Sequence, residues 1–297
     1  MPALNYHAGA EIPIIVNPAA RSTRAAGVID RIGALSPHVR ICQTAGGGDA
    51  RRLARELAEA GASVVVAAGG DGTMNEVVNG LATAEAAQRP ALGLLPTGTM
   101  NVLARELELP TGSLAACWEI IESGRAREID LWRAGDVFFA QLAGIGLDAE
   151  VICRTTWAAK RRLGPFSYLP RLVTALGREA PPFSIILDGG PPLTGTAMLV
   201  GNGAFYGGPV RAFPNARNDD GRLDILVIHR HAAAELCTLL IDILDGLTHE
   251  SSAYTRLQAK NLRLESTAPV PFQVDGEFVG HLPMTIERAA FPLRVLC

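Results

Sequence analysis

The stretch Ser63-Val-Val-Val-Ala-Ala-Gly-Gly-Asp-Gly-Thr-Met-Asn-Glu76 indicates how the first half of the chain folds. The apolar run that begins at Ser63 predicts a buried strand, and Gly69-Gly-Asp-Gly72 predicts a turn where that strand ends. Thr73 and Glu76 have the spacing of a capping box, which predicts that a helix begins there. A glycine turn between a strand and a helix start exposes main-chain N–H groups, and such groups favour a phosphate.

A second turn of the same kind follows the next predicted strand. Ala91 to Leu95 predicts the strand, Thr97-Gly98-Thr99 the turn, and Met100 to Leu107 the helix. Parallel strands end at one edge of a sheet, so both turns are expected to direct N–H groups into one crevice. The alternative is that these glycines only connect strands to helices. Two such turns in succession are stronger evidence for a ligand site than a single turn would be.

Asp71 lies in the first of these turns. Its carboxylate would repel a phosphate unless a divalent cation or a donor group lay between them. Asp71 is therefore a candidate for holding Mg²⁺ or for orienting a nucleotide.

Composition excludes several classes of function. The 297 residues are 48% hydrophobic and 19% charged with a net charge of −3, which disfavours disorder and a polyanion-binding surface, so nucleic acid is not an expected partner. The only lysines are Lys160 and Lys260, and neither lies in a glycine-rich setting, which excludes a P-loop and a protein-kinase site. Five scattered cysteines and the lack of a long apolar run predict a cytoplasmic chain without a transmembrane segment.

The pattern of apolar runs predicts two domains. Up to residue 128, strands that include Ile12–Val16 and Val39–Thr44 alternate with helical periods, which predicts an α/β domain with a doubly wound, mostly parallel sheet. From residue 129 to 297, short β runs separated by Gly, Pro and Asp predict an antiparallel β-sandwich. These runs are Ile129–Arg133, Val137–Ala143, Phe183–Leu187, Ala197–Gly201, Leu223–Ile228, Leu262–Glu265 and Val270–Val274. The final run, Met284–Leu296, predicts one or two strands, and the last can return to the first domain.

Three further segments of the second half each allow more than one interpretation, and a fourth predicts a helix. Val274-Asp-Gly-Glu-Phe278 is either a plain hairpin turn or a pair of carboxylates for acid–base chemistry. Asn218-Asp-Asp-Gly-Arg222 is either a turn or a loop that binds a hard cation. Lys160-Arg161-Arg162 is either a solvated face or a contact for anionic lipid headgroups, and the stripe from Leu236 to Leu247 predicts a core-facing helix.

Four motifs, in this order along the chain, resemble the diacylglycerol kinase catalytic-domain family, which includes bacterial soluble lipid kinases and the sphingosine and ceramide kinases. They are Gly69-Gly-Asp-Gly-Thr-Met-Asn-Glu-Val-Val-Asn-Gly80, Leu95-Pro-Thr-Gly-Thr-Met-Asn101, Ala143-Gly-Ile-Gly-Leu-Asp-Ala149 and Asp275-Gly-Glu277. The second motif departs from the family in having Val102 after Asn101, so no acidic role is expected there. The resemblance implies the fold shared by NAD kinases and diacylglycerol kinases.

The resemblance also implies roles for individual residues. Those implied to contact ATP are Asn17, Pro18, Thr44, Gly69, Gly70, Asp71, Gly72, Thr73, Met74, Asn75 and Thr99. Glu277 is implied as the base that activates the lipid hydroxyl, with Asp275 beside it, and together with Asp71 these are the candidate catalytic residues. The segment from Arg217 to Arg222 resembles the family's Mg²⁺ loop, in which Asp220 supplies its side chain and Arg217 and Arg222 their carbonyls.

The predicted function is ATP-dependent transfer of the γ-phosphoryl group to the hydroxyl of a lipid such as diacylglycerol, a reaction of phospholipid metabolism that uses Mg²⁺. The active site is expected between the two domains, and the partner is a lipid at the inner face of the membrane, where the chain would bind peripherally; a homodimer stays open. Two alternatives also stay open: NAD-kinase-like phosphorylation of a soluble nucleotide, and a non-catalytic nucleotide- or lipid-binding regulator. Intact Asp71, Asp275 and Glu277 count against the regulator.

Overall fold

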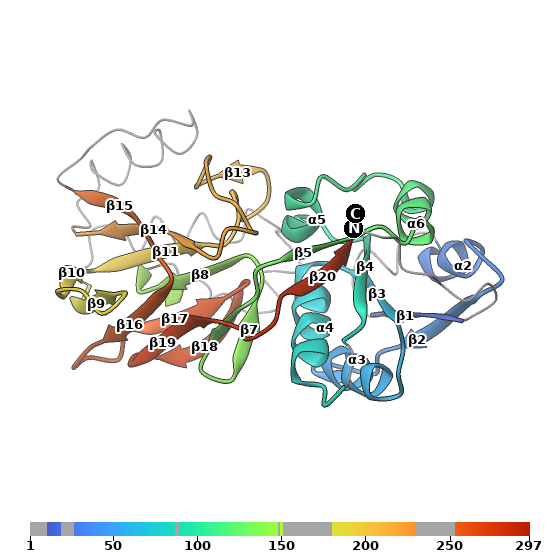
Figure 1. Ribbon diagram of the computed structural model, residues 1–297, viewed down its shortest axis with the longest axis horizontal. Helices are drawn as coiled ribbons and strands as arrows, with labels where there is room; N and C mark the ends of the chain where they lie inside the picture. Colours follow the sequence, from blue (N-terminus) through green and yellow to red (C-terminus); the bar gives the residue numbers. More distant parts are fainter. Residues whose placement is uncertain (1–10, 19–26, 87–88, 148, 151–179, 230–252) are drawn as a thin grey trace. The chain divides into compact units, whose positions relative to one another are not determined.

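The computed structural model describes residues 11–18, 27–86, 89–147, 149–150, 180–229 and 253–297 (Figure 1). It divides into two compact units, one made of Met1–Ile129 with Phe291–Cys297 and the other of Asp130–Ala290. The predicted helix Leu236–Leu247 and the basic cluster Lys160–Arg162 lie outside the described residues. None of the helices in the described ranges has the length and hydrophobicity needed to span a bilayer.

The first unit is built on a six-stranded sheet in the order β2-β1-β3-β4-β20-β5, with parallel pairing from β2 to β20. Its strands are β1 (Ile12–Val16), β2 (Val39–Gln43), β3 (Val64–Gly69), β4 (Ala91–Pro96), β5 (Ala126–Ile129) and β20 (Leu293–Leu296). Its helices are α2 (Val28–Gly33), α3 (Asp49–Glu59), α4 (Asp71–Thr83), α5 (Val102–Glu106) and α6 (Leu114–Glu122). The predicted doubly wound α/β architecture is therefore confirmed; α6 was not predicted.

The order of the strands tells where a ligand would bind. The chain passes from β1 to β2 on one side of β1 and then crosses back to β3 on its other side. Ligands of doubly wound sheets bind beyond the carboxyl ends of the strands at such a reversal. The β3 sequence Val-Val-Val-Ala-Ala-Gly is buried at every residue, as expected for a strand covered on both faces.

The final apolar run forms two strands in different units. β19 (Met284–Arg288) belongs to the second unit, whereas β20 pairs in parallel with β4 and antiparallel with β5 in the first. The chain therefore leaves the first unit after Ile129 and returns to it at Phe291.

The second unit contains two six-stranded sheets whose pairs are antiparallel throughout the described residues, in the orders β10-β9-β16-β19-β6-β7 and β15-β14-β11-β8-β17-β18. The remaining strands of these sheets are β6 (Trp132–Ala134), β7 (Val137–Phe139), β8 (Leu142–Ile145), β9 (Phe183–Leu187), β10 (Leu193–Gly195), β11 (Ala197–Gly201), β14 (Leu223–Ile228), β15 (Tyr254–Ala259), β16 (Asn261–Glu265), β17 (Pro271–Val274) and β18 (Glu277–His281). Two short strands, β12 (Phe205–Tyr206) and β13 (Val210–Arg211), pair separately with each other. Residues from both sheets, among them Trp132, Met198 and Phe272, form one buried cluster. The predicted antiparallel sandwich is confirmed.

Two predicted strands were wrong in their extent. Val137–Ala143 is divided into β7 and β8, because the N–H groups of Ala140 and Gln141 and the carbonyl of Ala140 bind side chains instead of a neighbouring strand. Ile129–Arg133 is likewise divided between β5 and β6, at the point where the chain passes between the units.

Candidate active site

The residues implied to bind ATP lie at one edge of the parallel sheet of the first unit. Asn17 and Pro18 follow β1, Thr44 follows β2, and the segment from Gly69 to Asn75 begins at the end of β3. Thr44 is buried, and its N–H donates to the carbonyl of Val16 at 2.9 Å. Because β1, β2 and β3 are parallel neighbours, the loops that follow them share this edge.

The two glycine turns are in direct contact. A Cβ placed on Gly98 would lie 2.4 Å from the Cα of Gly70, and the N–H of Thr97 donates to the carbonyl of Gly69 at 2.9 Å. No side-chain carbon approaches a main-chain atom so closely, so glycine is required at Gly98. The expectation that both turns lie together at the carboxyl ends of β3 and β4 is therefore met by the register of these strands.

Asp71 connects the first glycine turn to the helix after the second. Its Oδ2 accepts from the N–H of Asn101 at 3.0 Å and its Oδ1 from the N–H of Val102 at 2.6 Å. These are donors at the start of α5 that have no partner within that helix. Burial raises the pKa of Asp71 above its ordinary 3.8, an effect that outweighs the N–H bonds from Val102 and Asn101.

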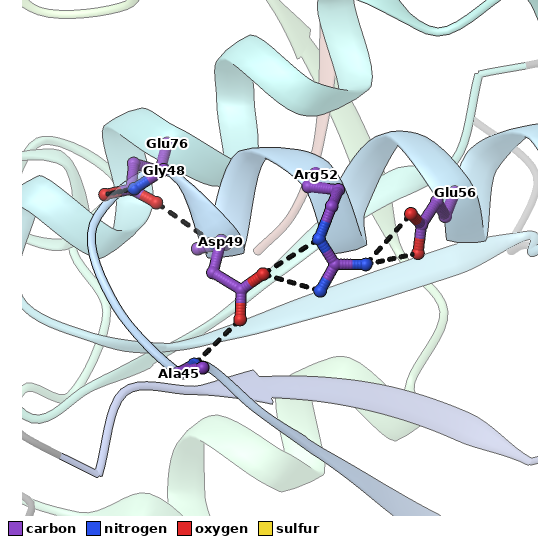
Figure 2. Close-up of polar contacts among 7 residues, drawn as sticks. Ala45, Gly48, Asp49, Arg52, Glu56 and Glu76 are labelled. Atoms are coloured by element: carbon purple, nitrogen blue, oxygen red, sulfur yellow. Dashed lines mark hydrogen bonds and ion pairs between the residues drawn. The ribbon is translucent and has the colours of Figure 1, made fainter.

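Glu76 acts on a neighbouring helix rather than on its own. Its Oε1 accepts from the N–H of Gly48 and its Oε2 from the N–H of Ala50, each at 3.0 Å, so it caps α3 (Figure 2). The capping box predicted for Thr73 and Glu76 was therefore wrong: α4 is preceded by Gly70, which offers no side-chain cap. The sequence placed the Glu76 carboxylate near the start of a helix. It could not show that α3 packs beside α4, which is why Glu76 caps α3 instead.

The second turn holds two buried acceptors that have no partner among the described residues. They are the Oγ1 of Thr97 and the Oδ1 of Asn101, whose amide group donates to the carbonyl of Gly98 at 2.8 Å. A buried polar atom without a partner is costly, which suits a position where a ligand supplies the missing donor. Asn101 is 6% exposed, and this role was not predicted from the sequence.

In the second unit, Asp275 and Gly276 form the two-residue turn of the hairpin between β17 and β18, with φ values of +46° and +82°. Asp275 also binds a second segment: its carboxylate accepts from the N–H groups of Ala140 and Gln141 at 3.1 Å and of Leu142 at 2.9 Å. The hairpin interpretation of this motif thus describes the backbone, while the Asp275 carboxylate fastens the hairpin to the start of β8.

Glu277, the first residue of β18, differs from Asp275 in its exposure and its hydrogen bonds. It is exposed, and no hydrogen bond to its carboxylate is found among the described residues. Phe278 beside it is 41% exposed, the only large hydrophobic side chain so exposed in the described part of the chain. Of the two carboxylates in this motif, that of Glu277 is the more accessible to a ligand.

The loop from Arg217 to Arg222 is organised by Asp130. The Asp130 carboxylate, 2% exposed, accepts from the N–H of Gly221 at 2.6 Å and forms an ion pair with Arg288, while its N–H donates to the carbonyl of Asn218. Sequence reasoning did not identify Asp130, because its partners lie far away in the chain.

The chemistry of this loop fits a hard cation. The Oδ1 of Asp220 accepts from the N–H of Arg222 at 3.0 Å, which leaves Oδ2 and main-chain carbonyls as ligands, all of them oxygens. In the described ranges, no three His, Cys, Asp or Glu side chains gather in one place. A cation at this loop would therefore need the carbonyls that the resemblance assigns to Arg217 and Arg222.

Asn202 is a second residue that sequence reasoning missed. It is fully buried, its amide group donates to the carbonyls of Asp130 and Ala140, and its Oδ1 accepts from the indole N–H of Trp132 at 2.7 Å. Its position between Gly201 and Gly203 at the end of a predicted strand was the available signal. Asn202 thus holds both the Asp130 segment and the segment that binds Asp275.

A parallel α/β sheet with paired glycine turns, combined with an antiparallel sandwich, defines the fold class shared by NAD kinases and diacylglycerol kinases. Within this class, the chain belongs to the diacylglycerol kinase catalytic domain family. The model of that domain matches residues 11–134, and the model described as YegS C-terminal NAD kinase beta sandwich-like domain matches residues 142–297.

Curated relatives and solved structures agree with this assignment. The chain is 34% identical over 273 residues to a protein of Chromohalobacter salexigens named "Probable lipid kinase YegS-like", covering 91% of this chain and 86% of that protein. It is 32% identical over 240 residues to a "Diacylglycerol kinase" of Staphylococcus carnosus, covering 80% of this chain and 77% of that protein. A crystal structure from Bacillus anthracis superposes with a TM-score of 0.81 at 29% identity, covering 96% of this chain and 94% of that one.

The yeast NADH kinase structure superposes with a TM-score of 0.51 at 13% identity, covering 99% of this chain and 85% of that one. This similarity concerns the fold alone. It does not favour the soluble-nucleotide kinase over the lipid kinase family to which the chain belongs.

Proposed function

We propose that the protein is an ATP-dependent lipid kinase that transfers the γ-phosphoryl group to the hydroxyl of a lipid such as diacylglycerol. The observation that carries this proposal is the contact between the two glycine turns at Gly70 and Gly98, at the edge of the sheet where α4 and α5 begin. The names of the relatives, a lipid kinase and a diacylglycerol kinase, support the choice of a lipid acceptor.

The phosphates of ATP would bind at the glycine turns. The N–H groups of the first turn of α4, which precede that of Met74, would bind the phosphates, and the helix dipole adds to the attraction for negative charge. Asn17, Pro18, Thr44 and Thr99 would complete the nucleotide site from the neighbouring loops. Asp71 would act by holding the start of α5 in place, since both of its oxygens accept main-chain N–H groups.

The acceptor hydroxyl would lose its proton to Glu277. An exposed carboxylate at the end of a tightly held hairpin can approach a substrate hydroxyl without first breaking a hydrogen bond of its own. Asp275 would keep this hairpin in register with β8. The oxygen of the deprotonated acceptor would attack the γ-phosphorus, and ADP would leave.

Magnesium would supply charge neutralisation for the phosphates and for the acidic loop of the second unit. The Asp220 carboxylate and the carbonyls of Arg217 and Arg222 would hold it in that loop, which the bonds from Asp130 keep folded. Arg105, whose Nε donates to the carbonyl of Met100 at 2.8 Å, would place a fixed positive charge near Asp71.

The proposal also places the protein in contact with a membrane surface from the cytoplasm, because the acceptor is a lipid. The test is [γ-³²P]ATP transfer with Mg²⁺ in mixed micelles that contain diacylglycerol, monoacylglycerol, ceramide, sphingosine or phosphatidylglycerol, with soluble NAD as a separate acceptor and Glu277→Gln as the blank. We expect label in one lipid that disappears with the variant.

Two other outcomes of this assay would contradict the proposal. Label in NAD alone would make the protein a soluble-nucleotide kinase. ATP binding without transfer to any acceptor would make it a nucleotide-binding regulator.

A further inference from the structure

Helix α4 carries two carboxylates that bind helices other than its own. Asp71 binds the start of α5, and Glu76 binds the start of α3. Since α4 begins at the first glycine turn, the loops that follow β2 and β4 are both tied to the loop that follows β3. The Asp71 contact joins the two glycine turns, which also touch at Gly70 and Gly98, whereas the Glu76 contact joins α4 to the exposed glycine loop that precedes α3.

The loop held by Glu76 runs from Thr44 to Gly48, with the sequence Thr-Ala-Gly-Gly-Gly. Packing does not define the conformation of this loop beyond Thr44: Ala45 to Gly48 are exposed, and a Cβ placed on Gly46, Gly47 or Gly48 would meet no atom within 4 Å. A run of three glycines also has a large conformational freedom to lose. Hydrogen bonds must therefore set the path of this loop.

Carboxylates make these hydrogen bonds at both ends of the loop (Figure 2). The Oδ2 of Asp49 accepts from the N–H of Ala45 at 2.7 Å, and Glu76 accepts from the N–H groups of Gly48 and Ala50. Asp49 belongs to α3 and moves with it. Glu76 is the connection between this loop and the helix of the first glycine turn.

The two helices are packed closely enough to make that connection rigid. A Cβ placed on Gly80 would lie 2.3 Å from the carbonyl oxygen of Arg51, so α4 and α3 approach each other as only glycine allows. Glu76 lies one turn before Gly80 on α4, and Ala50 lies next to Arg51. A displacement of α4 would thus be passed to the loop through Glu76.

We propose that Glu76 is a positioning residue for ATP, which sets Thr44 and its loop relative to the glycine turns without contacting the nucleotide. This proposal rests on the proposed function, since it takes Thr44 to contact ATP. Glu76 holds the glycine loop in the conformation that receives the nucleotide, and its removal weakens ATP binding while the acceptor side of the reaction is unaffected.

The test compares the wild type with Glu76→Ala, Glu76→Gln and the control Arg52→Ala, which removes the neighbouring ion pairs on α3 but leaves both Glu76 bonds in place. MgATP affinity is measured by calorimetry, KM for ATP and for the lipid by steady-state kinetics, and amide exchange at Gly48 and Ala50 by NMR. We expect about tenfold weaker ATP binding for Glu76→Ala and about threefold for Glu76→Gln, which keeps one acceptor oxygen. The KM for the lipid and the rate at saturating ATP should stay within about twofold.

The outcomes separate this proposal from the function on which it rests. Faster exchange at Gly48 and Ala50 with unchanged ATP affinity would overturn the positioning role, and so would an equal loss of affinity in Arg52→Ala. If Glu76→Ala does not fold, Glu76→Gln decides by the same criteria. Absence of ATP binding by the wild type would overturn the proposed function itself, whereas ATP binding without transfer would overturn only the kinase reaction and leave the affinity comparison valid.

Discussion

The motif of the first unit, Asp71 to Glu76, and that of the second, Asp275 to Glu277, each pair an aspartate with a glutamate, and the two pairs are used differently. In the first motif both carboxylates accept main-chain N–H groups of other segments. In the second, Asp275 accepts three such N–H groups while Glu277 is exposed without a bond to its carboxylate in the described part of the chain.

This difference distinguishes carboxylates that hold loops from a carboxylate that can perform chemistry. N–H groups that donate to a carboxylate hold it in place and stabilise its charged form, which disfavours its acting as a proton acceptor. Three of the four side chains are therefore assigned to holding the structure, and Glu277 is left as the candidate base. Substitutions at these positions test that division.

The largest effect is expected for Glu277→Gln. A general base contributes about 10²- to 10⁴-fold to rate, so kcat for lipid phosphorylation should fall by roughly that factor while the melting temperature and ATP affinity stay unchanged. Asp136→Asn is a matched control, because Asp136 is also an exposed carboxylate beside a glycine in a hairpin of the same unit. A rate near that of the wild type in folded Glu277→Gln would remove the distinction between the two motifs.

Gly98→Ala should have the next largest effect. Its Cβ would lie 2.4 Å from the Cα of Gly70, so the two glycine turns must separate. We expect a loss of about 1–3 kcal/mol in stability and at least about tenfold weaker ATP binding. Gly112→Ala is the control, since a Cβ there meets nothing within 4 Å and Gly112 lies in the same unit outside the nucleotide loops, and denaturant titration with calorimetry measures both quantities. Equal behaviour of the two variants would refute the contact.

Asp275→Asn tests the anchoring role in the second unit. Asparagine offers one acceptor oxygen and turns an NH₂ group toward main-chain N–H donors, so we expect a loss of about 1–3 kcal/mol in the free energy of unfolding. ATP affinity should not change, because the nucleotide loops belong to the first unit. Urea titration followed by near-UV circular dichroism measures the loss, and an unchanged midpoint would mean that the three N–H bonds do not hold the hairpin.

Asp71→Asn should change the dependence of stability on pH. The folded-state pKa of Asp71 is raised above 3.8 by burial, so the folded state binds more protons than the unfolded state just above that pH. The contribution of Asp71 to the free energy of unfolding therefore falls as the pH rises from about 3.8 to the pKa of Asp71 in the folded state. Above that pKa the contribution stays at its lower value. The variant should lack this decline, and urea titrations between about pH 4 and 7 would show it; an identical slope in both proteins would contradict the assignment.

Arg52→Ala should have the smallest effect. Its bonds to Asp49 and Glu56 involve a guanidinium group that is in contact with solvent, and such ion pairs contribute little to stability. We expect a small loss of stability that shrinks at high salt and no change in ATP affinity. A larger effect would show that the glycine loop depends on the whole network of Figure 2 rather than on Glu76.

Much of the fold followed from local patterns in the sequence. The buried runs at Ser63 and Ala91 and the glycines after them predicted both the parallel sheet and the edge at which the nucleotide residues gather. The Asp275-Gly276 turn was predicted from two residues, since few other pairs adopt positive φ at both positions of a hairpin turn. Such features depend on neighbours along the chain, which a sequence shows directly.

The long-range bonds could not be predicted in this way. Glu76 was expected to cap its own helix and instead caps α3, and the N–H donors of Asp275 come from a segment more than a hundred positions earlier in the chain. Asp130 and Asn202 were missed for the same reason. A carboxylate binds whichever buried donors lie within reach, and the folded chain alone determines which those are.

The sequence by itself thus determined the alternation of strands and helices, the glycine turns and the chemical types of side chain available at them, because backbone preference and hydrophobic period act over a few residues. The tertiary structure decided which carboxylates hold loops and which one stays exposed. It depends on the pairing of distant N–H groups, and it separates Glu277 from Asp71, Glu76 and Asp275, although all four are acidic residues of the two glycine-containing motifs.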